Sequence, residues 1–368
     1  MFGKLYLGEL KKLTRPKALI TISVVCVVLF IVFAIIYNIN INLDAFVNDM
    51  TDIAASIEGE IEVGETDETD DTSGDFADYV FGATPDNIDE KIAYFNAKLK
   101  EYQALNKQKE FEGYYATDIY DIECTIAMLE YMKANNVYGK FNVEGYTDYS
   151  LRNAESFVLG YVELVTAILI IYGIAMAAGL YADEYSRGTI KLIMLRPVTK
   201  NQVTTAKLLA LFTHLIAIFG IASLMGYVYG AIAYKSISLE KVYVVFNGSG
   251  VFASTVGGTV FYKMFFTVVK ILSYATLSYA IGTILRKKTP AIVLTLVVYL
   301  GIIAALFTFV GGERFIFSTN TDLSVYFGFV KTSFMDGGNF FIALPMLIVY
   351  LAVIIVSTYL VVDKRDVI

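Results

Sequence analysis

Residues 157–181 have the sequence FVLGYVELVTAILIIYGIAMAAGLY, in which Glu163 is the only charged residue. An apolar run of about 18 or more residues can cross the roughly 30 Å hydrocarbon core of a bilayer. Because the backbone must satisfy its own hydrogen bonds in lipid, such a run is expected to be helical. This stretch therefore predicts a transmembrane helix.

Five further apolar runs have similar lengths, and the 368-residue chain is 56% hydrophobic. They are Ala18–Tyr37, Leu208–Tyr234, Phe261–Leu285, Ala291–Val310 and Phe340–Val362. No small-x-small cleavage site follows the first run, so we expect a retained anchor and not a signal peptide. The predicted fold is an all-α integral membrane protein with six transmembrane helices.

Basic side chains are concentrated in one set of connecting segments. The N-terminal segment, 183–207, 286–288 and the tail after Val362 together hold fifteen Lys and Arg against five Asp and Glu. By the positive-inside rule these segments are cytoplasmic. We therefore expect a multi-pass membrane protein with both termini in the cytoplasm.

Residues 1–17 have the pattern of an amphipathic helix. Apolar side chains recur there at helical spacing, namely Phe2, Leu5, Tyr6, Leu10 and Leu13. Lysines and an arginine occupy the other faces. This pattern predicts a helix lying on the inner membrane surface ahead of the first span.

The segment between the first two spans is the only long polar part of the chain. Residues 38–155 hold 26 Asp and Glu against 8 Lys and Arg. Two apolar stripes at helical spacing predict a pair of packed helices. They are Ile88, Ile92, Phe95, Leu99 and Tyr102, with a helix start near Asp86, and Ile119, Ile122, Ile126 and Leu129. The acidic stretch Glu58–Asp75 is too poor in apolar residues to pack and is expected to be a mobile loop.

The predicted organisation has four parts. They are a cytoplasmic amphipathic helix at 1–17, the first span at 18–40, an acidic, largely helical extracellular domain at 41–156, and five further spans at 157–368 with a cytoplasmic loop at 183–203. The extracellular domain either caps the spans or handles a ligand.

Catalytic motifs are missing from the sequence. It contains no phosphate-binding G-x-x-x-x-G-K-[ST] loop, so we expect no ATP hydrolysis by that route. The single histidine, His214, lies in an apolar span, where a hydrogen bond between helices is more favoured than catalysis. Cys26 lies in a span and Cys124 in the outer domain, so no disulfide is expected. We therefore expect no catalytic residue, no metal and no cofactor in this chain.

The segment after the second span has the most specific pattern in the sequence. Residues 181–200 are YADEYSRGTIKLIMLRPVTK. Gly188 permits a helix C-cap, and Pro197 ends a short helix that follows it. Thr199 and Gln202 form a capping box for the third span. The segment is expected to be a rigid elbow that can insert into a groove on a partner.

This elbow resembles the first cytoplasmic loop of permease subunits of the type-two ABC exporters. The matching residues, in order, are Glu184, Gly188, Thr189, Arg196, Pro197 and Lys200. The amphipathic N-terminus and the ending at Val362–Asp366 are also similar to that family. The large outer segment departs from its commonest pattern and leaves the substrate open.

The resemblance implies an ATP-driven exporter in which this chain forms the translocation path and performs no covalent chemistry. ATP would be bound by a separate ABC ATPase subunit, and a second permease chain would complete a homo- or heterodimer in the lipid bilayer; no nucleic acid partner is expected. The residues it assigns to ATPase coupling are Glu184, Arg187, Gly188, Thr189, Ile190, Lys191, Ile193, Arg196 and Pro197. The alternative is a sensor or immunity receptor whose acidic outer domain binds a cationic peptide.

Two charges inside the predicted spans need an explanation, because an unpaired charge in lipid is costly. Counted at ~1.5 Å per residue from the inner ends of their spans, Glu163 and Lys270 both lie in the outer part of the core. They can reach the outer interface separately, pair with each other across the second and fourth spans, or contact a substrate. We expect them to be coupled.

The topology can be tested by cysteine labelling. A cysteine placed at Thr69 should react with an impermeant reagent in intact cells, because the acidic domain is predicted to face the medium. A cysteine at Lys287, in a loop predicted to be cytoplasmic, should react only after lysis. Labelling of the Thr69 position in lysed cells alone would show that the orientation is inverted.

Overall fold

The computed structural model describes residues 2–14, 25–28, 30–37, 84–107, 116–136, 154–190, 198–234, 242–246, 251–303, 315–324 and 340–364. Helices account for nearly all of these residues, which confirms the prediction of a helical membrane protein. One short antiparallel sheet was not predicted. In it, β1 (Val242–Phe246) pairs with β2 (Val251–Thr255), with Val244 opposite Ala253.

Among the described residues, four helices are long and apolar enough to cross a membrane. They are α6 (Ala154–Ser186), α8 (Lys200–Tyr234), α9 (Val256–Leu285) and α13 (Phe340–Lys364). The first and fifth predicted spans correspond to shorter apolar helices, Val25–Tyr37 and α10 (Lys288–Tyr299). Parts of both predicted spans, 18–24 and 304–310, lie outside the described residues, so the number of six stays a prediction.

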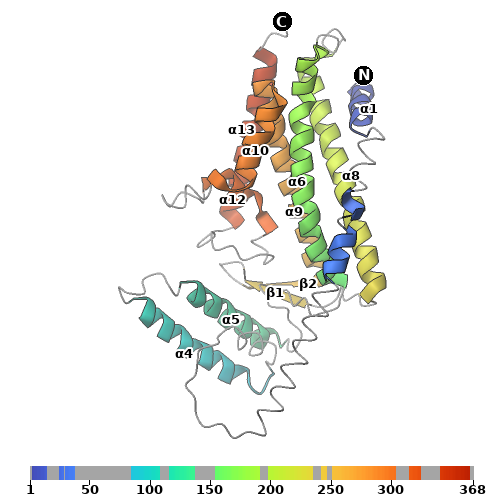
Figure 1. Ribbon diagram of the computed structural model, residues 1–368. Helices are drawn as coiled ribbons and strands as arrows, with labels where there is room; N and C mark the ends of the chain where they lie inside the picture. The colour runs from blue at the N-terminus through green and yellow to red at the C-terminus, as the bar shows by residue number, and fades with distance from the viewer. Residues whose placement is uncertain are drawn as a thin grey trace.

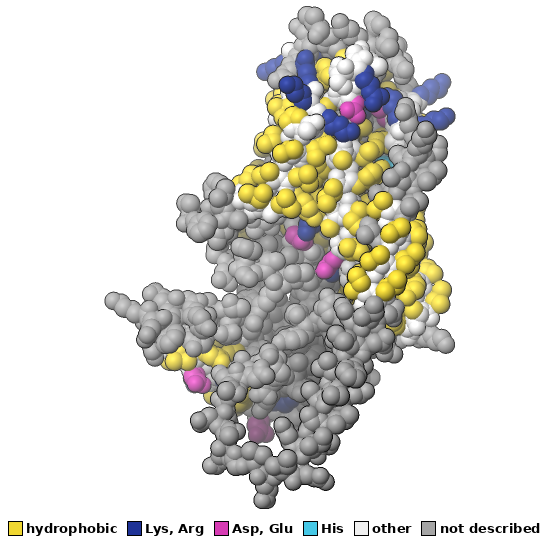
Figure 2. Space-filling model, viewed as in Figure 1, with side chains coloured by type: hydrophobic (Ala, Val, Ile, Leu, Met, Phe, Trp, Pro, Cys, Tyr) yellow, Lys and Arg dark blue, Asp and Glu magenta, His cyan; other side chains and the backbone are white. Residues whose placement is uncertain are grey.

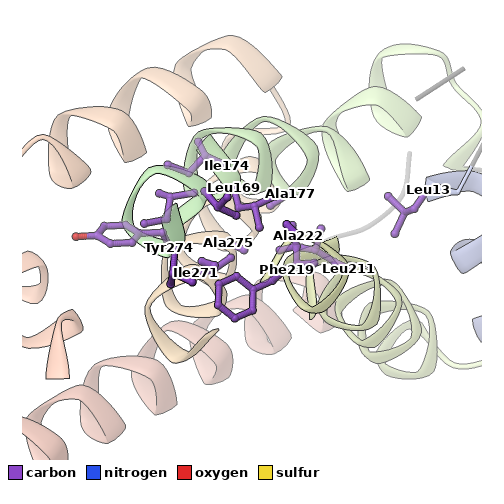
Figure 3. Close-up of a cluster of buried hydrophobic side chains, with 14 of the residues drawn as sticks. Leu13, Leu169, Ile174, Ala177, Leu211, Phe219, Ala222, Ile271, Tyr274 and Ala275 are labelled. Carbon is purple, nitrogen blue, oxygen red and sulfur yellow. The ribbon is translucent and has the colours of Figure 1, made fainter. Parts of the chain in front are cut away.

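The long helices form one bundle, with α6 and α9 at its centre. α6 packs against α8, α9 and α10, and α9 also packs against α13 (Figure 1). The side chains that fill the space between α6, α8 and α9 are almost all apolar (Figure 3). Those labelled from these helices are Leu169, Ile174, Ala177, Leu211, Phe219, Ala222, Ile271, Tyr274 and Ala275.

Hydrogen bonds between helices supplement this packing. The Ser278 hydroxyl on α9 donates to the Ile174 carbonyl on α6 at 2.8 Å. The Tyr172 hydroxyl on α6 and Nε2 of His214 on α8 lie 2.8 Å apart. The expectation that His214 bonds a neighbouring helix is therefore confirmed.

The basic segments gather at one end of the bundle, which we call the basic end. The C-terminal ends of α6, α9 and α13 lie there with α1 (Phe2–Leu13), and Lys and Arg side chains surround it above a broad hydrophobic band (Figures 1 and 2). The structure thus brings the described parts of the segments predicted to be cytoplasmic to one end.

At the opposite end, α4 (Ile88–Asn106) and α5 (Ala116–Asn135) lie beside the β1–β2 sheet (Figure 1). The two predicted stripes form one buried cluster around Phe95, Ile122 and Leu129. An ion pair between Lys133 and Asp89 joins the end of α5 to the start of α4, so the helices are antiparallel. The helical hairpin is confirmed, with α4 starting at Ile88 and not at Asp86. The predicted mobile loop Glu58–Asp75 lies outside the described residues.

Gly282 of α9 lies very close to the backbone of α6. A Cβ placed there would lie 2.6 Å from the backbone oxygen of Ala178 on α6. Small residues allow this kind of close packing between transmembrane helices. The α6–α9 contact therefore depends on the absence of a side chain at this position.

We predict that Gly282→Val lowers stability by about 1–3 kcal/mol, because the added atoms must push α6 and α9 apart. Thermal unfolding in detergent micelles measures this loss. Gly220→Val on α8 is the matched control, since nothing lies within 4 Å of a Cβ there. Equal losses from the two variants would show that helix propensity, and not packing, is responsible.

Candidate functional site

The elbow begins where α6 ends at the basic end. The amide of Arg187 donates to the Asp183 carbonyl and that of Gly188 to the Tyr185 carbonyl, both at 3.1 Å. Gly188 has φ +69°, a conformation that glycine adopts without steric cost. The predicted C-cap at Gly188 is therefore confirmed.

The elbow ends in the capping box that the sequence predicted. The Thr199 amide donates to Gln202 Oε1, and the Gln202 amide donates to Thr199 Oγ1, both at 3.3 Å. These reciprocal bonds define the start of α8. Both junctions of the elbow with the long helices are therefore fixed by local hydrogen bonds.

Between these junctions, the described part of the elbow is only partly buried. Ile190 is buried, and the Thr189 hydroxyl donates to the Glu184 carbonyl at 3.4 Å. The Arg187 side chain is exposed. Four of the predicted coupling residues lie outside the described residues. They are Lys191, Ile193, Arg196 and Pro197.

A buried lysine lies directly behind the elbow. Lys207 of α8 is fully buried, with an exposed fraction of 0%. Its ammonium donates to Glu184 Oε1 at 2.6 Å, to the Leu180 carbonyl at 3.2 Å and to Glu9 Oε2 at 3.3 Å. One cation therefore holds groups from α1, α6 and α8 together.

Lys12 of α1 completes this charge network. Its ammonium lies 2.7 Å from Glu9 Oε1 and 3.2 Å from Glu184 Oε1. The network thus contains two cations and two carboxylates, so it is neutral as a whole, and this pairing limits the desolvation cost. We call Glu9, Lys12, Glu184 and Lys207 the α1 network.

The electrostatics of the network favour an ionised Glu9. Burial alone would raise the pKa of Glu9, but Lys207 and Lys12 hold that pKa below its ordinary value. A carboxylate with a lowered pKa stabilises the folded state above its unfolded pKa, and that contribution is lost as the pH falls through the lowered value. The α1 contact is therefore intact at neutral pH and weakens in acid.

The network changes one expectation and extends another. Glu184 was expected to bind a partner, but only 14% of its side chain is exposed and Oε1 is held by Lys207 and Lys12. Its other oxygen, Oε2, is buried and has no hydrogen-bond donor within the described residues. The N-terminal helix is expected to lie on the inner membrane surface, and the structure adds that it turns Leu5, Glu9 and Leu13 inward, with Leu5 packing against Val203 and Ala206 of α8.

The rest of the basic end is also connected to the elbow. Lys288 at the start of α10 lies 3.6 Å from Asp183, and the Arg286 guanidinium lies 4.5 Å from the centre of the Tyr185 ring. The Lys200 ammonium donates to the Asp363 carbonyl on α13 at 3.0 Å. A displacement of the elbow would therefore reach α8, α9, α10 and α13.

The charges near the other end pair differently from our prediction. Lys263 of α9 lies 2.7 Å from Glu163 of α6, and Lys270 pairs with Asp322. The expected pairing of Glu163 with Lys270 was therefore wrong. The reason is the length of α6, which continues to Ser186, so that Glu163 lies ~34 Å from its end. On α9, Lys263 lies ~33 Å from the end of the helix and Lys270 only ~22 Å. Glu163 is therefore level with Lys263.

Sequence reasoning missed Glu9 and Lys207 because each was counted only as one more charge of a basic segment. A signal for Glu9 was present, since it lies four residues from both Leu5 and Leu13 on the face that proves to be buried. Lys207 is likewise a charged residue on the buried face of its helix, about two turns after the start of α8. Within the described ranges, no group of His, Cys, Asp and Glu side chains is arranged to hold a metal.

We predict that Lys207→Met releases α1 from α8, because two carboxylates would then share only Lys12. Removing one partner of a buried ion pair costs about 3–5 kcal/mol. Disulfide formation between cysteines at Leu5 and Val203, in a chain without Cys26 and Cys124, measures the contact. Lys11→Met, at an exposed position of α1, is the control. Unchanged cross-linking in the Lys207 variant would show that apolar packing alone holds α1.

Comparison with known proteins identifies the family of the chain. The pattern of the ABC-2 family transporter proteins matches residues 5–367. An uncharacterized protein of Bacillus subtilis (strain 168), YhcI, is 24% identical over 208 residues, which make up 54% of this chain and 64% of that protein. The match thus spans less than two thirds of the length of that relative. Because the family pattern covers nearly the whole sequence, the chain belongs to the ABC-2 family of membrane transport proteins.

Proposed function

We propose that this chain is the membrane subunit of an ATP-driven exporter and that a separate ATPase subunit drives it through the elbow. The observation that carries the proposal is the pair of hydrogen-bonded junctions at the basic end, one at Gly188 and one at Thr199, with Glu184 of the α1 network directly before the first. If the segment between these junctions is the rigid elbow that its sequence predicts, it can seat in a groove on a partner.

The long helices give the elbow its leverage. It joins α6, of 33 residues, to α8, of 35 residues, so each helix is ~50 Å long and exceeds the thickness of the hydrocarbon core. A movement at the elbow would be carried by both helices to the opposite end of the bundle. Lys207 would move α1 with them, because α1 is attached to the same two helices.

In this proposal the exposed residues bind the ATPase and the buried ones transmit its movement. Arg187 is exposed and remains a candidate contact, whereas Glu184 acts within the chain. Arg196, in the same loop, would supply a second contact. The basic end then faces the cytoplasm of a bacterial cell, and both termini lie there.

A second permease chain would complete the path. The α13 helix presents a row of exposed apolar side chains that includes Phe341, Val349 and Val353. Such a surface suits either lipid or a second subunit. The path would run along the dimer interface, and the α4–α5 hairpin would cover its outer end.

We predict that Gly188→Val distorts the elbow and weakens both ATPase association and transport, because a β-branched residue resists a positive φ. Gly188→Asn is the matched control, since asparagine tolerates this conformation. Arg196→Glu should keep the geometry and reverse one contact charge, with the same loss of function. Co-purification with the ATPase, ATP turnover and transport are measured together at normal expression.

Wild-type association and transport in both Gly188→Val and Arg196→Glu would refute the coupling role of the elbow. ATPase binding that leaves substrate distribution unchanged, even in the wild type, would instead favour the sensor or immunity receptor.

A further inference from the structure

A polar face runs along the outer two thirds of α9, a helix that is otherwise largely apolar. Lys263, Thr267, Lys270 and Tyr274 follow one another at spacings of four, three and four residues, which places them on one side of the helix. Charged side chains within a span generally face protein or a water-filled path and mark functional sites. The basic end and the elbow make no use of this face.

The face meets a carboxylate on each side. Lys263 pairs with Glu163 of α6 at 2.7 Å, and Lys270 pairs with Asp322, which follows α12 (Phe317–Thr321). The Tyr274 hydroxyl accepts a hydrogen bond from Thr321. The four charges therefore join α9 to α6 on one side and to the α12 segment on the other.

Part of this face lies at the depth of the hydrocarbon core. Lys270 is ~22 Å from the basic end of α9, within a core of roughly 30 Å, and Asp322 must lie at the same depth because the two are bonded. Irregular backbone at this depth is tolerated where protein buries it or where it lines a watery cavity. Leu323 is buried, but the Asp322 side chain remains 29% exposed.

The exposed edge of the face is acidic. The Glu163 side chain is 51% exposed, whereas that of its partner Lys263 is only 8% exposed. Lys263 holds one oxygen of Glu163, and within the described residues no bond to the other oxygen is found. An arriving molecule therefore meets a carboxylate with a spare acceptor, and the ammonium lies behind it.

We propose that the exposed Glu163 carboxylate, which borders this face on α6, binds the ammonium or guanidinium head of a cationic amphiphile. This inference rests on the proposed export function and names its substrate class. An anionic head would meet the carboxylate first, and a neutral head would gain no charge-assisted bond. The acidic excess of residues 38–155, predicted to face the same side, would raise the local concentration of cations.

The test uses the full chain in nanodiscs of zwitterionic lipid, without the ATPase and with empty nanodiscs subtracted. Dodecylamine is the cationic probe, and dodecyl sulfate is the anionic probe of equal chain length. We expect the amine to bind saturably and the sulfate not to do so. Glu163→Gln should weaken amine binding about ten-fold or more, because a bond to a charged group is lost. Glu123→Gln, at an exposed position of α5, is the control and should bind as wild type.

Lys263→Gln gives the second measurement and the sharper one. It removes the cation that competes for Glu163, so the affinity for the amine should rise. If the ion pair were purely structural, Glu163→Gln and Lys263→Gln would both be less stable, and amine binding would be unaffected. Lower or unchanged amine affinity in Lys263→Gln, or saturable binding of the sulfate, would overturn the inference. Because no ATPase is present in this test, a failure to bind the amine would not affect the conclusion about ATPase coupling through the elbow. Conversely, a failure of the elbow variants to lose ATPase association would not affect the amine-binding result.

Discussion

The arrangement of the basic end depends on the Lys207 ammonium, which is fully buried. A buried charge is tolerated only with close partners, so Glu184 of α6 and Glu9 of α1 must both approach α8. That requirement adds to the apolar packing of Leu5 against Val203 and Ala206 in setting the position of α1 on α8. The elbow starts one turn after Glu184, so its position is tied to the same charge.

Much of this fold is predictable because each prediction used a local rule. The apolar runs predict the long helices, Gly188 predicts a left-handed cap, and the pair Thr199 and Gln202 predicts a capping box. The α4–α5 hairpin follows from stripes of side chains at helical spacing. In each case the residues that decide the structure are neighbours in the sequence, and their geometry depends little on the rest of the chain.

Contacts between distant residues were harder to predict. Glu163 was assigned the wrong lysine because the second span was predicted to end at Tyr181, five residues before α6 ends. An error of five residues changes the expected depth of Glu163 in the membrane by more than one helical turn. Asp322 was not considered, since its depth is known only once its bond to Lys270 is seen. The β1–β2 sheet was missed although Val- and aromatic-rich stretches flank Asn247–Gly250, because short strands were not sought between two spans.

The two charged regions lie on the same rigid element. Glu184 at one end of α6 belongs to the α1 network, and Glu163, 21 residues earlier and so ~32 Å away, pairs with Lys263 on the polar face of α9. Gly282 brings α9 into backbone contact with α6 between these two levels, so the pair would tilt as one body. If the proposed ATPase subunit binds the elbow, thermodynamic linkage makes the coupling reciprocal: where its binding changes the affinity of the outer face for a cation, a cation bound there must change the affinity of the elbow for that subunit by the same factor. A transporter of this design would sense its cargo through the helix that moves it.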